Sequence, residues 1–353
     1  MGDMGRGIVA VEPGKRRIKV GVAGFGNVGR AFVELLVERR ELLDSRYGID
    51  VSVSFVADSK GVLARREGLP WSLLALSLKV PRGGVSGLEG GSPGMSVEEA
   101  IAATDIDVLV DVTPSNYSRP DPQLKWYRLV LGSGGAVVTA DKAPLATRCD
   151  SLLTASWRPR LFYKATVMAG TPLIDMLRWG FSGRIVERVT GILNGTTNYV
   201  LGLAEEGLGF EEAIRDAQRR GYAEPDPSSD LEGLDLAAKA AIISCTLGSP
   251  TTLWSVERRS VVNEEAFERA REAFSRGRRV KYVAVVEVGK GSFVDLVEVS
   301  KNSVLFNVSG AMNAVVIRSS EAEEVTVMGP GAGRKATAAA LLSDLVLAAR
   351  EVS

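Results

Sequence analysis

The chain has 353 residues, enough for two domains that each bury a hydrophobic core. Lys plus Arg and Asp plus Glu number 43 each, so the formal charge is zero and the composition does not favour a nucleic acid or an anionic membrane as partner. No apolar run approaches the roughly 20 residues of a membrane span, and the N-terminal segment lacks the apolar core of a signal peptide. We therefore expect a soluble, cytoplasmic protein.

Histidine is absent from the sequence, which restricts the chemistry open to the protein. Its absence excludes His-based nucleophilic triads and the usual zinc sites, so any proton transfer must use Lys, Asp, Glu, Tyr or water. The two cysteines, Cys149 and Cys245, are far apart and form no CxxC motif. We therefore predict two reduced thiols with no metal or redox role.

A glycine-rich turn follows the first predicted strand. The apolar run 17–23 predicts a buried strand and the segment 30–36 predicts a helix. Between them stands the motif Gly24, Phe25, Gly26, Asn27, Val28, Gly29. Glycines at these positions permit a tight turn and let a pyrophosphate reach the helix N-terminus, so the motif indicates dinucleotide binding. The alternative is a glycine turn with a purely structural role.

The next predicted strand, 51–57, ends where such domains contact the ribose of the coenzyme. It is followed by Asp58, Ser59 and Lys60. Asp58 favours a free 2′-hydroxyl, as in NAD, whereas Lys60 could hold the 2′-phosphate of NADP. The choice between NAD and NADP therefore stays open. We expect the segment 61–95, with several glycines and prolines, to be loop-rich and peripheral.

Two further predicted strands, 108–112 and 136–139, continue a parallel sheet. Ligands bind beyond the carboxyl ends of the strands in such sheets, and Thr113, Pro114 and Lys142 follow these ends. Position alone favours an ordinary surface lysine for Lys142. Together these segments predict an α/β fold with a Rossmann-type dinucleotide-binding domain over residues 17–148.

After Pro144 the pattern changes to mixed strands and helices. Strands are predicted at 161–167, 185–193, 280–286, 293–299, 314–318 and 325–328, and helices at 172–179, 197–206 and 210–220. This order predicts a second, α+β domain with a mixed sheet over residues 149–325, for substrate binding and dimerisation. The turn 329–333, which ends at Gly333, opens a last helix at 336–350. It is either a second anion- or amide-contacting loop or a plain connection.

A proline-stiffened acidic loop precedes an almost wholly apolar helix. Pro225 and Pro227 keep the segment from 221 to 227 out of regular structure. Ser229 as N-cap and Glu232 three residues on form a predicted capping box, and the helix should run to Leu247.

Asp235 and Lys239 lie one turn apart on this predicted helix. Such a pair is commonly a surface ion pair worth about 0.3–0.5 kcal/mol. Here the helix offers almost no polar face, so both charges are expected to meet protein or ligand. Buried charges are costly unless they are paired, which makes a functional site plausible.

Taken together, these segments resemble homoserine dehydrogenase from about residue 18 to the C-terminus. The resemblance rests on the glycine motif with Arg30, on VTPSN at 112–116, TADKAPLA at 139–146, GILNGTTNY at 191–199 and GYAEPDP with GLDLAAK between 221 and 239. It implies the reversible interconversion of L-homoserine and L-aspartate 4-semialdehyde with NADH or NADPH, in threonine, methionine and isoleucine biosynthesis. It also implies a homodimer, and a C-terminal segment, 326–353, that returns to the nucleotide-binding domain.

The resemblance assigns roles to individual residues. Lys142 and Lys239 correspond to the catalytic lysines. Residues expected near the substrate are Glu224, Asp230, Asp235, Asn194, Gly195 and Thr196. Those expected near the coenzyme are Gly24, Phe25, Gly26, Asn27, Val28, Gly29, Asp58, Ser59, Lys60, Thr113, Pro114, Lys142 and Gly333. The sequence does not decide which lysine transfers the proton and which binds the substrate carboxylate.

Two positions depart from the family pattern. Asp141 stands where the family usually has Asn, and it places a negative charge beside Lys142. Lys164 stands where similar proteins carry a Glu that holds a monovalent cation with backbone carbonyls matching Val167, Ala169 and Thr171. We expect no metal here, because the Lys164 ammonium would replace the ion at these carbonyls. The alternative is that Lys164 points to solvent.

Two other functions remain possible on the sequence alone. One is a different amino-acid or semialdehyde dehydrogenase, but a phosphorylating semialdehyde dehydrogenase needs a positioned nucleophilic cysteine, and neither cysteine lies in such a motif. The other is an NAD(P)-binding regulatory protein that kept the fold and lost catalysis, which the changes at Asp141 and Lys164 would explain. The chain also ends after the last predicted helix, so we expect no kinase domain or C-terminal regulatory module.

Overall fold

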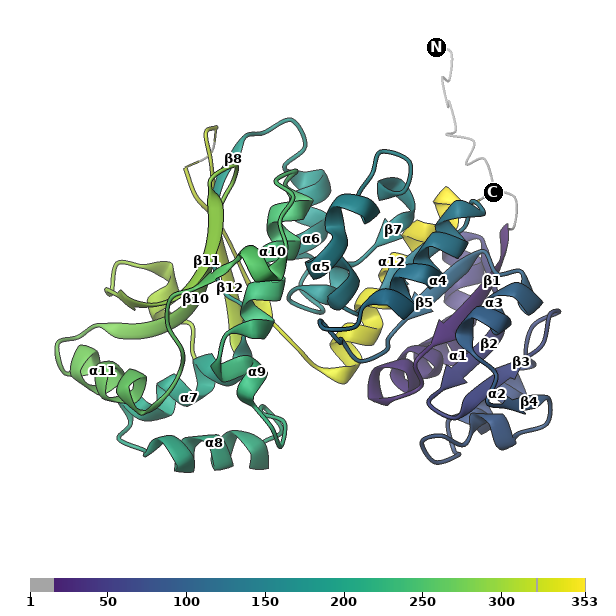
Figure 1. The fold of residues 1–353 in the computed structure, drawn as a ribbon, viewed down its shortest axis with the longest axis horizontal. Coiled ribbons are helices and arrows are strands. Elements are labelled where there is room, and N and C mark those ends of the chain that lie inside the picture. The colour runs from purple at the N-terminus through teal and green to yellow at the C-terminus, as the bar shows by residue number, and fades with distance from the viewer. Residues whose placement is uncertain (1–15, 322, 353) are drawn as a thin grey trace, which may run out of the picture.

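A computed structural model describes residues 16–321 and 323–352. The chain forms two lobes, each built around one β-sheet, and the C-terminal helix returns to the lobe that contains the N-terminal strand (Figure 1).

The first sheet has the strand order β4-β3-β2-β1-β5-β6-β7. Its strands are β1 (Arg16–Ala23), β2 (Ile49–Asp58), β3 (Gly61–Ala64), β4 (Gly91–Pro93), β5 (Val108–Asp111), β6 (Ala136–Thr139) and β7 (Leu161–Phe162). The run from β2 to β7 is parallel, while β3 and β4 add an antiparallel edge. The central strands β5 and β6 are buried along their whole length, which explains their unbroken apolar runs.

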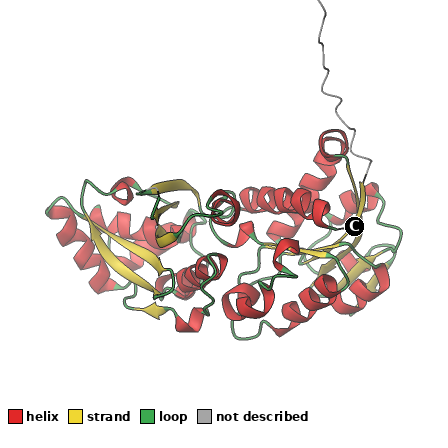
Figure 2. Cartoon of the chain, turned by 90° about the horizontal axis from the view of Figure 1, so that it is seen from above, coloured by secondary structure: helices red, strands yellow, loops and turns green. Residues whose placement is uncertain are grey.

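Helices flank this parallel sheet. They are α1 (Asn27–Tyr47), α2 (Trp71–Ser77), α3 (Val97–Thr104), α4 (Asp121–Gly132), α5 (Ala143–Leu152) and the C-terminal α12 (Arg334–Glu351), with a 3-10 turn η1 (Val85–Gly87). α12 packs against α1 and β6, so the C-terminal helix belongs to the same lobe as the N-terminal strand and helix. Parallel strands need crossover connections, and α1, α4 and α5 lie in the connections between parallel strands. Figure 2 shows helices lying against the strands of each lobe.

The second sheet is mixed and has the order β13-β12-β8-β10-β11-β9. Its strands are β8 (Val186–Ile192), β9 (Glu257–Arg258), β10 (Arg279–Glu287), β11 (Gly291–Val299), β12 (Met312–Ser319) and β13 (Val325–Pro330). All its pairs are antiparallel except the short β9 beside β11. The predicted fold class, a Rossmann-type lobe plus an α+β lobe with a mixed sheet, is confirmed.

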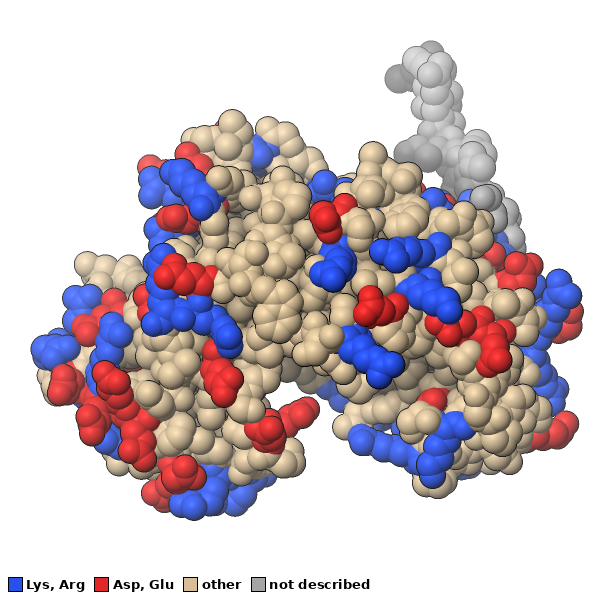
Figure 3. All heavy atoms as spheres, viewed as in Figure 1, with Lys and Arg blue, Asp and Glu red and all other residues tan. Residues whose placement is uncertain are grey.

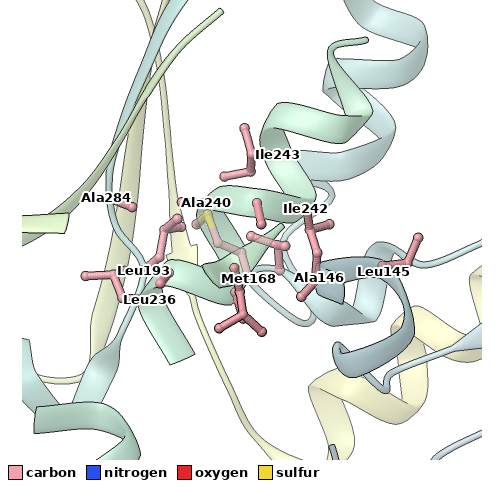
Figure 4. Close-up of a cluster of buried hydrophobic side chains, with 14 of the residues drawn as sticks. Leu145, Ala146, Met168, Leu193, Leu236, Ala240, Ile242, Ile243 and Ala284 are labelled. Atoms are coloured by element: carbon pink, nitrogen blue, oxygen red, sulfur yellow. The ribbon is translucent and has the colours of Figure 1, made fainter. Parts of the chain in front are cut away.

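The remaining helices and 3-10 turns belong to the second lobe or flank β7. They are α6 (Leu173–Asp175), the π-turn η4 (Met176–Gly180), α7 (Gly195–Glu205), α8 (Phe210–Arg219), α9 (Ser228–Leu231), α10 (Leu234–Thr246) and α11 (Glu264–Ser275); the 3-10 turns are η2 (Arg158–Arg160), η3 (Lys164–Thr166), η5 (Leu253–Ser255) and η6 (Val304–Asn307). α10 packs against both α5 and β10. Figure 4 shows the apolar side chains at this junction, where Ala146 of α5 lies beside Ile242 of α10.

Two local predictions about these elements were wrong, on the segment 161–167 and on Ser229. The segment 161–167 is not a strand of the second sheet: its first two residues form β7 beside β6, and η3 follows. The segment 61–95, predicted to be loop-rich, contains the short elements β3, α2, η1 and β4 with turns between them. Ser229 lies inside the short α9, so it does not cap the long helix; that helix begins after Gly233, whose φ of 76° interrupts the chain between α9 and α10.

The prediction of two reduced thiols was also wrong. Cys149 on α5 and Cys245 on α10 form a disulfide across 96 residues of sequence. Spacing could not reveal this pairing, because it depends on the packing of two helices from distant parts of the chain.

Candidate functional site

The glycine turn after β1 leaves room for a phosphate group. Gly24 has a φ of 97°, and a Cβ there would lie 2.7 Å from the Val112 backbone. A Cβ on Gly29 would lie 2.1 Å from the Gly24 carbonyl oxygen, so both glycines are required by packing. A Cβ on Gly26 would meet nothing within 4 Å, and no side chain caps α1. The N-terminus of α1 therefore carries no side-chain cap and has free space beside Gly26, as pyrophosphate binding requires.

Asp58 and Lys60 lie at the end of β2, as predicted, and a second cation joins them. The two carboxylate oxygens of Asp58 accept hydrogen bonds from the backbone amides of Lys60 (2.9 Å) and Val85 (3.1 Å). Arg82, which the sequence analysis missed, donates to Asn27 Oδ1 in the glycine turn at 2.7 Å. The Pro-Arg-Gly-Gly turn at 81–84 was its only sequence signal. Two cations and one carboxylate thus flank the expected ribose position.

A buried polar network lies beneath the carboxyl ends of β5 and β6. Asp111 Oδ1 accepts hydrogen bonds from the Thr113 amide at 3.0 Å and the Thr113 hydroxyl at 2.7 Å. Tyr127 donates to Asp111 Oδ2 at 2.6 Å and also lies 2.7 Å from the Thr139 hydroxyl. This network fixes the backbone at Thr113, next to the expected coenzyme position.

Asp141, the first departure from the family pattern, belongs to this network. Its Oδ1 accepts a hydrogen bond from the Ala143 amide at 2.9 Å, at the start of α5. Burial raises the pKa of Asp141, and burial together with the charge of Asp141 raises the pKa of Asp111 to about 7. Asp111 and Asp141 are therefore two buried carboxyl groups close enough to interact, and Asp141 directly precedes Lys142.

Three charged side chains from both lobes meet above this network. Lys142 precedes α5, and its Nζ lies 3.5 Å from Asp235 Oδ1. Lys239 Nζ lies 2.7 Å from Asp235 Oδ2 and donates to the Leu193 carbonyl at 2.5 Å. Burial alone would raise the pKa of Asp235, but the two ammonium groups hold it well below its usual value. Asp235 therefore bridges the two lysines and stays ionised.

The GILNGTTNY segment brings polar side chains to the same place. Asn194 caps α7 and donates to Asp230 Oδ1 at 2.7 Å and to Asp235 Oδ2 at 3.1 Å. Thr196 donates to the Tyr222 carbonyl at 2.7 Å, which ties α7 to the acidic loop. Burial, followed by the charge of Asp235, raises the pKa of Asp230. Asp230 and Asp235 are therefore close but differ in how strongly the fold favours their charged forms.

Gly195 and Glu224, also predicted near the substrate, have different surroundings. A Cβ on Gly195 would lie 2.9 Å from the Ala311 carbonyl, so close packing requires a glycine there. Glu224 is exposed in the acidic loop, and its backbone carbonyl accepts a hydrogen bond from Gln218 at 3.2 Å. Among the ion pairs of the described residues, none joins Glu224 to the lysine cluster.

Tyr117 is a neighbour of the cluster that the sequence analysis missed. It follows Ser115, whose hydroxyl accepts a hydrogen bond from the Lys142 amide at 2.9 Å. Burial, and then the charges of Asp235 and Asp141, raise the pKa of Tyr117 well above its usual value. Its place directly after VTPSN was the only sequence signal.

The second glycine turn, 329–333, connects β13 of the second lobe to α12 of the first lobe. A Cβ on Gly329 would lie 2.2 Å from Thr171 Oγ1, and one on Gly331 would lie 2.1 Å from Asn313 Nδ2. Gly333 has a φ of 130° and directly precedes α12 without a side-chain cap. Close packing within the protein therefore requires glycine at 329 and 331, independently of any ligand contact.

Lys164 has partners that neither sequence-based alternative included. It is buried, and its ammonium forms ion pairs with Asp175 and with Asp344 (3.4 Å) and donates to Ser343 at 3.0 Å. These carboxylates, rather than the carbonyls of Val167, Ala169 and Thr171, are the contacts that the structure gives it. Burial, partly offset by Lys164, raises the pKa of Asp344 to about 7. Within 16–321 and 323–352, no group of three or more acidic or cysteine side chains could hold a metal ion.

The surface gives no strong electrostatic signal. Figure 3 shows charged side chains of both signs scattered over one face, with a notch between the lobes. In the described part of the chain, no helix is both long and apolar enough to cross a bilayer.

A glycine turn after the first strand of a parallel sheet, with lysines and carboxylates of both lobes meeting at the sheet's carboxyl edge, defines an NAD(P)-dependent dehydrogenase. A model of the homoserine dehydrogenase family matches residues 172–346. The homoserine dehydrogenase of Sulfurisphaera tokodaii is 33% identical over 339 residues, covering 95% of this chain and 99% of that protein. The chain belongs to the homoserine dehydrogenase family.

Two further comparisons concern the coenzyme. A protein of Pseudomonas canavaninivorans described as NAD(+)-dependent homoserine dehydrogenase is 34% identical over 93% of this chain and 95% of its own length. A hyperthermophilic archaeal homoserine dehydrogenase solved with NADPH has a TM-score of 0.79 and 28% identity, covering 96% of this chain and 99% of that one. The predicted use of NAD or NADP is therefore supported, without a decision between them.

Proposed function

We propose that this protein catalyses the reversible, NAD- or NADP-dependent oxidation of L-homoserine to L-aspartate 4-semialdehyde. The observation that carries the proposal is the bridge in which Asp235 contacts Lys142 from one lobe and Lys239 from the other. It places two ammonium groups and an ionised carboxylate beside the end of the sheet where the coenzyme binds in this family.

The two lysines have different roles in the reaction, proton transfer and substrate binding. When bound, the coenzyme accepts the hydride from the alcohol carbon or returns it to the aldehyde carbon. Lys142 is the better placed of the two to move the hydroxyl proton: its one ion pair among the described residues is 3.5 Å long, whereas Lys239 has two shorter contacts. Lys239, fixed by its two short contacts, binds the substrate and keeps Asp235 in place.

The acidic groups of the site bind the substrate's α-ammonium. Asp230 and Asp235 lie on one side of Asn194, and Glu224 stands exposed on the adjoining loop. A bound ammonium would offset the repulsion between Asp230 and Asp235. We expect Glu224 to reach the ligand only when the loop closes.

Lys60 and Arg82 bind the 2′-phosphate when the coenzyme is NADP. Lys60 follows Asp58 closely in the chain, and Arg82 reaches Asn27 in the glycine turn. The carboxylate oxygens of Asp58 already accept backbone hydrogen bonds. Cations at this position favour a phosphate, and the hydrogen-bonded carboxylate is less available to a ribose hydroxyl.

Two further proposals concern a cation and the oligomer. The Lys164 ammonium, paired with Asp175 and Asp344, makes activity independent of added monovalent cations. The protein is a homodimer through the second sheet, whose edge strand β13 carries the exposed Met328. Light scattering should give twice the chain mass, and a monomeric mass would contradict the dimer.

Steady-state assays of L-homoserine oxidation with NAD and with NADP test the function. Lys142→Met and Lys239→Met should each lower kcat by about a hundredfold or more. Lys125→Met is the matched control, because Lys125 pairs with Glu98 on the surface (3.3 Å) and should leave kcat unchanged. No turnover by the wild type with either coenzyme would favour a protein that has lost catalysis.

A further inference from the structure

The disulfide joins the two helices that begin at the candidate site. Lys142 immediately precedes α5, and Cys149 lies near the end of that helix. Asp235 lies in the first turn of α10, and Cys245 lies in its last turn. The Cα atoms of the two cysteines are 6.2 Å apart. The same pair of helices is therefore connected twice, by an ion pair at their N-termini and by a covalent bond near their C-termini.

This double connection fixes how the helices lie. At about 1.5 Å per residue, the ion pair and the disulfide are separated by about 10 Å along α5 and about 15 Å along α10. Helices that meet at both ends run side by side in the same direction, so the disulfide limits how far α5 can slide or turn on α10. Arg148 interrupts the helical backbone of α5 directly before Cys149. The disulfide joins the part of α5 beyond this irregular residue directly to α10.

Other contacts hold the C-terminal end of α10 to the segment around β7 of the first sheet. Thr246 bonds to the Tyr163 hydroxyl at 3.1 Å, and its carbonyl accepts a hydrogen bond from Arg158 at 2.9 Å. The apolar contact between Ala146 and Ile242 also remains without the covalent bond (Figure 4). The protein should therefore fold without the disulfide, while the position of α5 on α10 would be less restricted.

We propose that the Cys149–Cys245 disulfide is a positioning element of the active site, which sets the position of α5 on α10 and thereby the contact of Lys142 with Asp235. Both cysteines are buried, with 2% and 4% of their surface exposed, so the bond acts permanently and is not a readily reducible switch. The proposal rests on the proposed roles of Lys142 and Lys239.

The test compares the wild type with Cys149→Ala/Cys245→Ala. Thiol titration in guanidinium without reductant should find no free thiol in the wild type. The variant should lower kcat for L-homoserine about tenfold, because small displacements of reacting groups are costly. Its KM for the coenzyme should stay within about twofold, since the glycine turn of the coenzyme site lies outside these helices. Hydrogen exchange at the amides of the first turns of α5 should become faster.

Tyr163→Phe is the matched control, because it removes a contact at the same end of α10 but keeps the disulfide. It should leave kcat and the exchange of α5 near wild-type values. Two free thiols in the wild type, or an alanine variant with unchanged kcat and unchanged exchange, would overturn the proposal. If the wild type oxidises no homoserine, the proposed function fails, and the exchange measurement still decides whether the disulfide positions α5.

Discussion

Replacing Asp235 with Asn removes the charge that bridges the two lysines while keeping the shape of the side chain. Asp235 Oδ2 lies 2.7 Å from Lys239 Nζ and Asp235 Oδ1 lies 3.5 Å from Lys142 Nζ. With an effective dielectric constant of about 20, these distances correspond to attractions of about 6 and about 5 kcal/mol. Desolvation offsets much of this, and breaking a buried pair typically costs about 3–5 kcal/mol. We expect Asp235→Asn to lower the free energy of unfolding by about 3 kcal/mol.

The pH dependence of this loss is a sharper test than its size. The lysines depress the pKa of Asp235, so its stabilisation is present above the pKa of an unfolded Asp, about 3.9, and is lost as the pH falls toward the lower folded value. The difference in unfolding free energy between wild type and variant should therefore be constant from about pH 5 to pH 8 and shrink below about pH 4. Urea denaturation across this range measures it.

Asp230→Asn is the matched control for this experiment. Burial and the charge of Asp235 raise the pKa of Asp230, so removing its charge should cost little stability near neutral pH. Equal losses in Asp230→Asn and Asp235→Asn, or a loss in Asp235→Asn that grows steadily between pH 5 and pH 8, would refute the reasoning. Asp235→Asn should also lower kcat/KM for homoserine about a hundredfold, because the lysines lose their common partner.

Three other substitutions give distinct outcomes. Asp141 contributes to raising the pKa of Asp111 to about 7, so the wild type should lose stability as the pH rises from about 4 toward 7. The melting temperature of Asp141→Asn should fall less than that of the wild type between pH 5 and pH 8. Lys164→Glu gathers three carboxylates, so added sodium or calcium should raise the melting temperature of the variant but not of the wild type. Replacing Lys60 and Arg82 with Ala should raise the KM for NADP about tenfold or more and change that for NAD by less than about twofold, as initial rates would show.

Local features of the site were accessible from the sequence. The glycine motif between a strand and a helix indicates a tight turn from neighbouring residues alone. The structure has this turn, and close packing leaves no room for a side chain at Gly24 or Gly29. Asp235 and Lys239 pair because they lie one turn apart on a helix, and that periodicity is visible in the sequence.

Features that depend on distant packing were not accessible. Lys164 was singled out, but its amide and its ammonium bind Asp344, which lies 180 residues away. The cysteines were treated as separate thiols because nothing in their spacing indicates that α5 and α10 lie side by side. The family resemblance brought Lys142 and Lys239 into one site, whereas position alone favoured an ordinary surface lysine at 142.

Helix boundaries were misplaced where tertiary contacts override local signals. Ser229 and Glu232 have the spacing of a capping box, but Gly233 ends the short α9 in a left-handed conformation. A Cβ at Gly233 would lie 2.2 Å from the Tyr282 hydroxyl, so packing against β10 requires a glycine and places the helix start there. The sequence contained the glycine but not the reason for it.

A crystal structure with L-homoserine and the oxidised coenzyme would show whether Lys142 is placed to move the hydroxyl proton. We expect the substrate hydroxyl within about 3.2 Å of Lys142 Nζ, the hydrogen-bond reach that proton transfer requires. We also expect the substrate's α-ammonium beside Asp230, between the two lobes. A hydroxyl more than about 5 Å from both Lys142 and Lys239, or a substrate bound wholly within one lobe, would contradict these expectations.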